Sequence, residues 1–277
     1  MKKIALVLIL SLILIFSAGC VTESDKIIGN WKTVEPYSDE YYSMNYVVTF
    51  NEDNSGKLVE TVSPDGITGT FPIIWKKTGD KTYRFEELTT FKLSEDSKSL
   101  TSNYGYTYTG GDGFTNGTWV QNGVKGDEYR YEYVFNSDGS GVETYYEGDL
   151  VERYNITWRD MGSNMFEYTY IFTVEFSDDG KTLYGIWGTP CKESDGVWTE
   201  EPEDDYRYYY SYEFLDDNMC KSVCYYNDSD EVYDIYYYVC SESGNEITLI
   251  EIYMTYLEMQ DDGTIKDLKR SVSLKKV

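Results

Sequence analysis

The sequence predicts an all-β protein of antiparallel meanders, and two patterns in the chain support this fold class. Aromatic residues alternate with polar or smaller ones in several segments, most clearly in 129–135, 168–176 and 206–214. Such a period of two is typical of a strand that buries one face. Between the segments stand Asp-Gly, Ser-Gly and Gly-Asp pairs, which are turn signals of β-hairpins. No stretch after residue 20 has a convincing helical period, so strands are expected from there on.

The composition favours the same fold class. The chain has 30 tyrosines, and aromatic residues make up 17% of it, which offers ample surface to bury despite a net charge of −25. Tyr and Phe favour strands, whereas the strong helix formers Ala and Leu are scarce after the first 20 residues. The chain is therefore expected to be folded and β-rich rather than disordered.

The chain repeats one pattern three times. A Gly-x-Trp motif ends at Trp31, Trp119 and Trp198, with spacings of 88 and 79 residues. About twenty residues later, each copy has a strand that ends in Phe and an acidic turn, at 50–56, 135–141 and 214–220. A repeat of this kind indicates tandem modules. Three are expected, at 28–112, 113–193 and 194–277.

Two shared positions are changed in the third copy. The first two copies have Trp75 and Trp158, each four residues before a Gly, where the third copy has Cys240. Cys220 likewise replaces the Gly that ends the acidic turn of the other copies. Folding the intervening segment as a hairpin places Cys240 opposite residues 217–218, within diagonal reach of Cys220. We interpret the two changes as a disulfide that replaces Trp packing.

The motifs together are similar to a known group of proteins. An opening Gly-x-Trp, an acidic turn after Phe, a Trp strand and the run Phe-Ser-Asp-Asp-Gly-Lys-Thr-Leu at 176–183 resemble the lipocalin-like domains of prokaryotic surface lipoproteins. The resemblance implies small β-barrels, in which Trp31, Trp119 and Trp198 plug one barrel end. From the strand pattern alone, a pair of packed sheets (a β-sandwich) is the alternative architecture.

The N-terminus has the features of a secretory signal. Two lysines carry positive charge, 4–16 is an uncharged apolar run, and three small residues precede Cys20. Thirteen residues are too few to cross a hydrocarbon core, which takes about 20. Residues 1–19 are therefore expected to be a signal-peptide helix that is removed, and 20–27 a tether.

The residues around Cys20 resemble the lipobox of prokaryotic lipoproteins. The match is Ser-Ala-Gly-Cys, and it departs from that family at Ser17, where Leu is usual. The resemblance implies that the Cys20 thiol is acylated and holds the mature chain on a membrane. The alternative is an ordinary cleaved signal followed by a free cysteine.

The remaining cysteines suggest cross-links. Four lie after Cys20, and an even number in an exported chain indicates two disulfides. The preferred pairing joins Cys220 to Cys240, which leaves Cys191 with Cys224. Four cysteines allow three connectivities, so the other two stay open.

Composition excludes several kinds of chemistry. The chain has no histidine, which rules out His-based catalytic triads and imidazole metal sites. The net charge argues against nucleic acid and anionic lipid as partners. Acidic pairs such as Glu200-Glu201 and Asp204-Asp205 are interpreted as solvated loops, and no pair stands out as the two carboxylates of a glycosidase. We therefore expect no enzyme and no cofactor.

Two acidic turns also imitate the first half of a calcium loop. In 51–56 and 136–141, oxygen-bearing side chains recur at every second position before a Gly. Neither turn is followed by the bidentate Glu of such a loop, and the same residues make a hairpin turn with a Gly bulge. The hairpin is the preferred interpretation, and no metal site is expected.

Three sequons for N-glycosylation occur in the chain. Asn116 and Asn227 are the candidate sites, while Asn155 lies inside a predicted strand and is the least favoured.

The sequence thus predicts an acidic lipoprotein on the cell-surface or periplasmic face of a membrane, with a non-catalytic binding or interaction role. Its specific form binds a small apolar ligand inside one module. The alternative is a structural or adhesive array that binds polysaccharide or envelope proteins through outer aromatic faces. A carboxylate-based hydrolase is the least favoured function.

Overall fold

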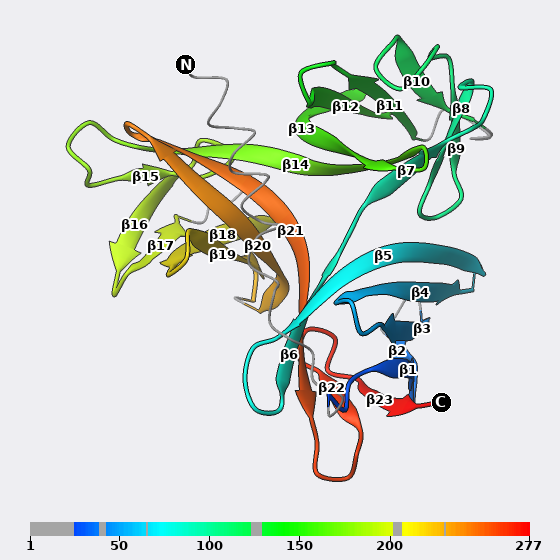
Figure 1. The fold of residues 1–277 in the computed structure, drawn as a ribbon. Coiled ribbons are helices and arrows are strands. Elements are labelled where there is room, and N and C mark those ends of the chain that lie inside the picture. Colours follow the sequence, from blue (N-terminus) through cyan, green and yellow to red (C-terminus); the bar gives the residue numbers. More distant parts are fainter. Residues whose placement is uncertain (1–24, 39–42, 65, 123–128, 202–206, 230) are drawn as a thin grey trace. The chain divides into compact units, whose positions relative to one another are not determined.

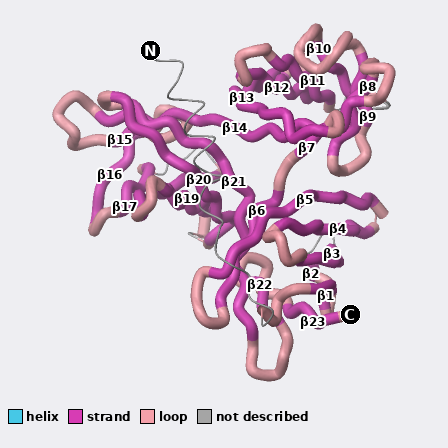
Figure 2. The backbone as a smooth tube through the Cα atoms, viewed as in Figure 1, coloured by secondary structure: helices cyan, strands magenta, loops and turns pink. Residues whose placement is uncertain are grey.

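The computed structural model describes residues 25–38, 43–64, 66–122, 129–201, 207–229 and 231–277 (Figure 1). Every regular element within these ranges is a β-strand, and Figure 2 shows strands and loops with no helix in the described trace. Neighbouring strands pair antiparallel. The predicted all-β antiparallel fold is therefore confirmed. The signal-peptide helix expected at 1–19 lies outside the described residues, as do Cys20 and the next four tether residues.

The chain divides into two compact units. Unit 1 comprises the described residues up to Glu87 together with Thr255–Val277, and unit 2 comprises Leu88–Met254. The strands of unit 1 are β1 (Gly29–Thr33), β2 (Tyr37–Ser38), β3 (Ser43–Phe50), β4 (Ser55–Ser63), β5 (Ile67–Lys77), β6 (Thr82–Glu87), β22 (Ile265–Asp267), β23 (Ser273–Lys276) and the last residues of β21 (Glu246–Met259).

The rest of β21 belongs to unit 2, which holds fourteen further strands. They are β7 (Thr90–Leu93), β8 (Ser99–Ser102), β9 (Thr107–Thr109), β10 (Thr118–Gln121), β11 (Arg130–Phe135), β12 (Ser140–Glu147), β13 (Leu150–Gly162), β14 (Met165–Phe176), β15 (Leu183–Tyr184), β16 (Pro190–Ser194), β17 (Val197–Glu200), β18 (Tyr208–Leu215), β19 (Met219–Tyr226) and β20 (Val232–Ser243).

In unit 1 the strands form a ladder that returns to its start. The order runs β3, β4, β5, β6, β21, β22, β23, β1, and β1 pairs back with β3. The inward side chains form a hydrophobic cluster that includes Trp31, Phe50, Trp75 and Phe85, none more than 2% exposed. The Trp31 indole also donates a 2.6 Å hydrogen bond to the carbonyl of Ile27, so its one polar atom is satisfied inside the cluster.

Unit 2 contains two such ladders, which share β14. In one, β7 to β14 pair in chain order and β14 pairs back with β7. In the other, β14 to β21 pair in chain order and β21 pairs back with β14. Figure 1 shows β14 as one long arrow that serves both ladders. One hydrophobic cluster forms around Trp119 and Phe135, and another around Tyr212 and Leu249.

These clusters do not follow the boundaries drawn from the sequence repeat. Strands β7 to β9 fall in the expected segment 28–112, but their side chains pack in the cluster around Trp119. Strands β22 and β23 fall in 194–277, but they complete the cluster around Trp31. The last strands of the first repeat therefore pack with the second copy, and the last strands of the third repeat pack with the first copy. The modules 28–112, 113–193 and 194–277, and their lipocalin-like architecture, stay an interpretation of the sequence.

The predicted period of two is seen in β11 and in part of β14, but not in β18, where the adjacent residues Ser211 and Tyr212 are both buried. In β11, Tyr133 and Phe135 are buried, whereas Arg130 and Val134 are exposed. In β14, Val174 is buried and Glu175 exposed. Burial of alternate aromatic side chains is what selects the register of these strands, because a slip by one residue would expose them all.

Candidate ligand-binding pocket

One face of a continuous sheet in unit 2 carries a group of tyrosine and glutamate side chains. Eight strands are hydrogen-bonded side by side in the order β11, β12, β13, β14, β21, β20, β19, β18. Directly paired residues point to the same face of a sheet. Tyr131 is therefore level with Tyr145, Glu143 with Tyr154, and Tyr238 with Glu251.

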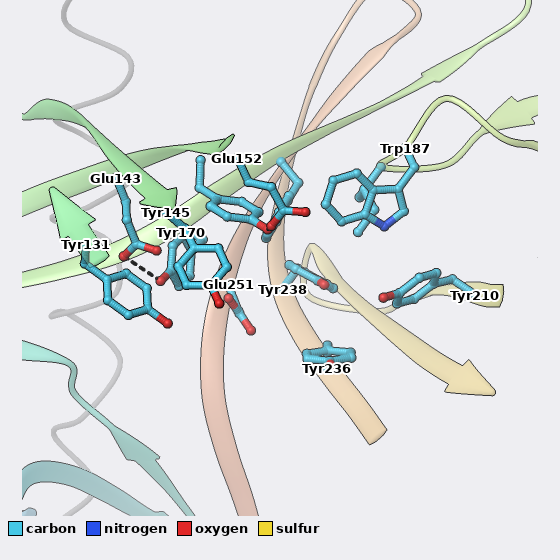
Figure 3. Close-up of a pocket in the computed structure, with 13 residues that line it drawn as sticks. Tyr131, Glu143, Tyr145, Glu152, Tyr170, Trp187, Tyr210, Tyr236, Tyr238 and Glu251 are labelled. Atoms are coloured by element: carbon cyan, nitrogen blue, oxygen red, sulfur yellow. Dashed lines mark hydrogen bonds between the residues drawn. The ribbon is translucent and has the colours of Figure 1, made fainter. Parts of the chain in front are cut away.

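A pocket of about 370 Å³ opens on this face. Nine aromatic side chains, three carboxylates and one Ile line it (Figure 3). They are Tyr131, Glu143, Tyr145, Glu152, Tyr154, Tyr170, Phe172, Ile186, Trp187, Tyr210, Tyr236, Tyr238 and Glu251. All but Ile186 and Trp187, which lie between β15 and β16, come from the strands of this sheet. The volume suits a small organic molecule.

Glu143 is the most deeply placed acid of the pocket. Its side chain is 2% exposed, and the Tyr170 hydroxyl donates a 2.8 Å hydrogen bond to it. Figure 3 shows this bond within the pocket. Burial raises the pKa of the Glu143 carboxyl, while hydrogen bonds from Tyr133 and Tyr170 act in the opposite direction. The site therefore holds a carboxyl group whose negative charge is costly unless a cation offsets it.

The other two carboxylates lie on neighbouring strands. Tyr154 donates a 2.5 Å hydrogen bond to Glu152, and Glu251 is 6% exposed. Among the residues that line the pocket in the described part of the chain, none is Lys or Arg. The described wall of the pocket therefore combines negative charge with aromatic surface and contains no positive side chain.

The aromatic wall runs from one end of the pocket to the other. Figure 3 places Tyr131 at one end and Trp187 with Tyr210 at the other. Trp187 is 57% exposed, which is unusual for a side chain of its size. Burial is the main cause that raises the pKa of Tyr210 and of Tyr238 well above 10. These phenols are thus neutral at physiological pH, and their rings offer uncharged stacking surfaces.

The two acidic turns that imitate calcium loops are hairpin turns. In the first, Asp53 accepts hydrogen bonds from the backbone and hydroxyl of Ser55, and the Trp75 indole donates to the carbonyls of Asn51 and Ser55. The second turn repeats this pattern with Asp138, Ser140 and Trp158. One carboxylate oxygen of each Asp and the backbone carbonyls at both ends of each turn thus accept hydrogen bonds within the turn itself. Among the described residues, no group of three or more Asp, Glu or Cys side chains is arranged to hold a metal ion.

The third copy keeps the strand register around this turn but changes its side chains. Cys220 pairs with Phe214 as Gly56 pairs with Phe50. The Cys240 amide donates a 2.7 Å hydrogen bond to the carbonyl of Asn218, which confirms that Cys240 lies opposite this turn. Gly56 has no room for a side chain, because a Cβ there would lie 2.1 Å from the Thr49 carbonyl oxygen. The local backbone differs in the third copy, where Asp217 and Asn218 both have positive φ, whereas Asn54 alone does in the first.

The four described cysteines are free thiols. Cys240 is the main cause that raises the pKa of the Cys220 thiol, which agrees with the proximity expected from the hairpin register. Cys191 lies instead beside Glu200, and Cys224 beside Tyr210. The structure therefore brings together the first pair of the predicted connectivity. Both disulfides themselves stay predictions.

The remaining candidate residues lie away from the pocket. Trp119 is fully buried, and its indole donates to the carbonyl of Phe114, whereas Trp198 is only half-buried and packs edge-on against Phe176. Their role as barrel plugs stays a prediction. Of the glycosylation candidates, Asn116 is exposed and Asn227 half-buried.

One interpretation of the sequence is wrong. Glu200 was expected in a solvated acidic loop, but it is 4% exposed at the end of β17. Its carboxylate accepts hydrogen bonds from the Tyr210 amide at 3.0 Å and the Tyr212 hydroxyl at 3.1 Å. Pairing of β17 with β18 turns Glu200 inward, so the acidic pair does not form one solvated run. Asp204 and Asp205 lie outside the described residues.

Sequence reasoning also missed Glu143, Glu152 and Glu251. The sequence signal that could have found them is the alternation of strand faces. Glu143 lies two residues from the buried Gly141, and Glu251 two residues from the buried Leu249, so each acid falls on the inward side of its strand. An acid on an inward position is uncommon and marks a special site. Their convergence depends on pairing between β14 and β21, which are far apart in the chain.

Comparisons with known proteins leave the fold and the pocket as the main guides to function. No family model matches the chain, and no curated protein matches it. A solved porin-like protein from Bacteroides uniformis is 11% identical and covers 81% of this chain and 95% of its own, with a TM-score of 0.21. That score is too low to support an argument. Among the described residues, no helix is long and apolar enough to span a membrane.

Proposed function

We propose that the protein is a non-catalytic binding lipoprotein of the cell envelope, anchored through Cys20, that binds a small molecule in the pocket of unit 2. The observation that carries the binding role is the pocket itself, a 370 Å³ cavity with aromatic side chains on most of its wall. The anchor rests on the signal features of residues 1–19 and on the thiol at their end.

The nature of the wall refines the ligand expected from the sequence. The clusters around Trp31, Trp119 and Tyr212 are filled by the chain's own side chains. The open cavity has carboxylates at Glu143 and Glu152, which disfavour a fatty-acid anion and a purely apolar molecule alike. A ligand with polar groups and a face that stacks on aromatic rings fits better.

The anchor is tested by changing its thiol. In a prokaryotic host that processes lipoproteins, the wild-type chain is expected in the membrane fraction, labelled by an alkyne-tagged palmitate. Cys20→Ser is expected to lose the label and to leave the membrane fraction, because no acyl chain can be attached. A matched Ser17→Ala control should keep both. Equal labelling of wild type and Cys20→Ser would contradict the anchor.

The pocket is tested by removing its exposed aromatic side chain. A chemically mixed set of small molecules is screened against the full-length Cys20→Ser chain by saturation-transfer NMR. Ligands of the pocket are expected to lose most of their signal with Trp187→Ala, since stacking on this ring is removed. Tyr184→Ala is the matched control, because Tyr184 is also exposed (41%) but lies outside the lining. Binding that is insensitive to Trp187→Ala, or no binding at all, would contradict the proposal.

A further inference from the structure

Unit 1 shows how this chain satisfies a group of inward-facing acids. Arg270 donates hydrogen bonds to Glu60 at 3.1 Å and to Glu87 at 3.0 Å, and forms an ion pair with Asp267 at 3.4 Å. The three acids are 5%, 13% and 0% exposed at their side chains. The guanidinium also lies 5.3 Å from the centre of the Tyr46 ring. One cation thus sits among three carboxylates and an aromatic face.

The pocket of unit 2 has the same chemistry without the cation. Glu143, Glu152 and Glu251 face one cavity with Trp187 and several tyrosines, and the described lining contains no Lys or Arg. The Tyr154 hydroxyl donates a hydrogen bond to Glu152, and the Tyr170 hydroxyl donates one to Glu143. These bonds satisfy part of each carboxylate but do not neutralise its charge. A positive group is therefore the natural complement of this wall.

We infer that the pocket binds an organic cation, a small molecule that carries a guanidinium or ammonium group. This inference rests on the proposed function and specifies its ligand. Carboxylates attract the charge, the guanidinium or ammonium N–H groups donate to them, and the aromatic faces add cation–π attraction. A neutral sugar would use the rings but gain little from the charge. An anion would be repelled by the wall and by a chain of net charge −25.

The test compares probes that differ only in charge. Calorimetric titrations at low ionic strength use the full-length Cys20→Ser chain with n-butylguanidinium against n-butylurea, and with n-butylammonium against 1-butanol. Glucose and cellobiose are titrated as neutral stacking probes. The cations are expected to bind saturably and at least about tenfold more tightly than their neutral counterparts, because charge-assisted hydrogen bonds are about twice as strong as neutral ones.

Variants then locate the binding. Glu143→Gln and Glu152→Gln keep the shape of the wall and are each expected to weaken cation binding by about tenfold or more. Glu175→Gln is the matched control, since this exposed residue lies on the outer face of β14. Thermal melting checks that each variant is folded. Because Gln can still accept from a tyrosine hydroxyl, both pocket variants are expected to fold.

The outcomes separate the two proposals. If the neutral probes or the sugars bind as tightly as the cations and Trp187→Ala abolishes that binding, charge recognition is wrong and the pocket remains a binding site. If cations bind but Glu143→Gln, Glu152→Gln and Glu175→Gln behave alike, the inference is also overturned, because the attraction is then general rather than local. If no probe or library member binds, the proposed function fails as well.

Discussion

Replacing Arg270 by Met is expected to destabilise unit 1 by about 3–5 kcal/mol, because the variant leaves three inward carboxylates without their cation. Met matches the length of the aliphatic stem but donates no hydrogen bond. Glu60, Glu87 and Asp267 would then repel one another in a site that water reaches poorly. The loss is a large fraction of the stability of a typical domain.

Urea denaturation followed by tryptophan fluorescence measures this effect, since Trp31 and Trp75 lie in the core of unit 1. The free energy of unfolding of Arg270→Lys is expected to lie between those of wild type and Arg270→Met. An ammonium keeps the charge, but it cannot donate to several acids in the planar geometry of Arg. Lys266→Met, on the exposed side of β22, is the matched control and should change little. The interpretation of the cluster fails if Arg270→Met unfolds at the same urea concentration as the control.

Replacing Glu200 by Gln is expected to stabilise the protein above neutral pH and to flatten its stability between about pH 4.5 and 7. Burial raises the pKa of Glu200 to about 7 from its ordinary 4.5, against the opposing hydrogen bonds from Tyr210 and Tyr212. One pKa unit corresponds to about 1.4 kcal/mol, so the folded state loses about 3 kcal/mol when this carboxyl must ionise.

The direction follows from proton binding in the two states. Between pH 4.5 and 7, folded Glu200 keeps its proton and unfolded Glu200 does not, so the free energy of unfolding falls as pH rises. The destabilisation caused by ionising Glu200 is therefore absent below about pH 4.5 and complete above about pH 7. Glu143 contributes in the same direction, because burial raises its pKa too.

Urea titrations of wild type and Glu200→Gln at pH 4, 6 and 8 isolate the Glu200 contribution. The difference should be smallest at pH 4 and reach about 1–3 kcal/mol in favour of Gln at pH 8, less the cost of any hydrogen bond the amide makes poorly. Glu242→Gln, at an exposed position of β20, serves as the control. A difference that does not grow with pH would mean that Glu200 is not held protonated by burial.

The residues near one another in the chain determined the secondary structure and the turns. Alternating aromatic residues predicted the strands, because a strand with one buried face must repeat every second residue. The acidic turn after Phe50 predicted a hairpin, since the Asp53 side chain accepts a hydrogen bond from the backbone amide two residues on. The register that places Cys240 opposite Asn218 was likewise predictable, because only one hairpin separates them.

The tertiary structure alone decided which strands close each ladder and where the acids meet. The cluster in unit 1 joins Glu60 and Arg270, which are 210 residues apart, and the pocket depends on pairing of β14 with β21. Strands pair through backbone N–H and C=O groups that nearly all residues share, so the residue types of a strand do not specify which distant strand it pairs with. An inward-facing acid is visible in the sequence, but whether a cation reaches it from the same chain, as Arg270 does, depends on how distant strands are brought together.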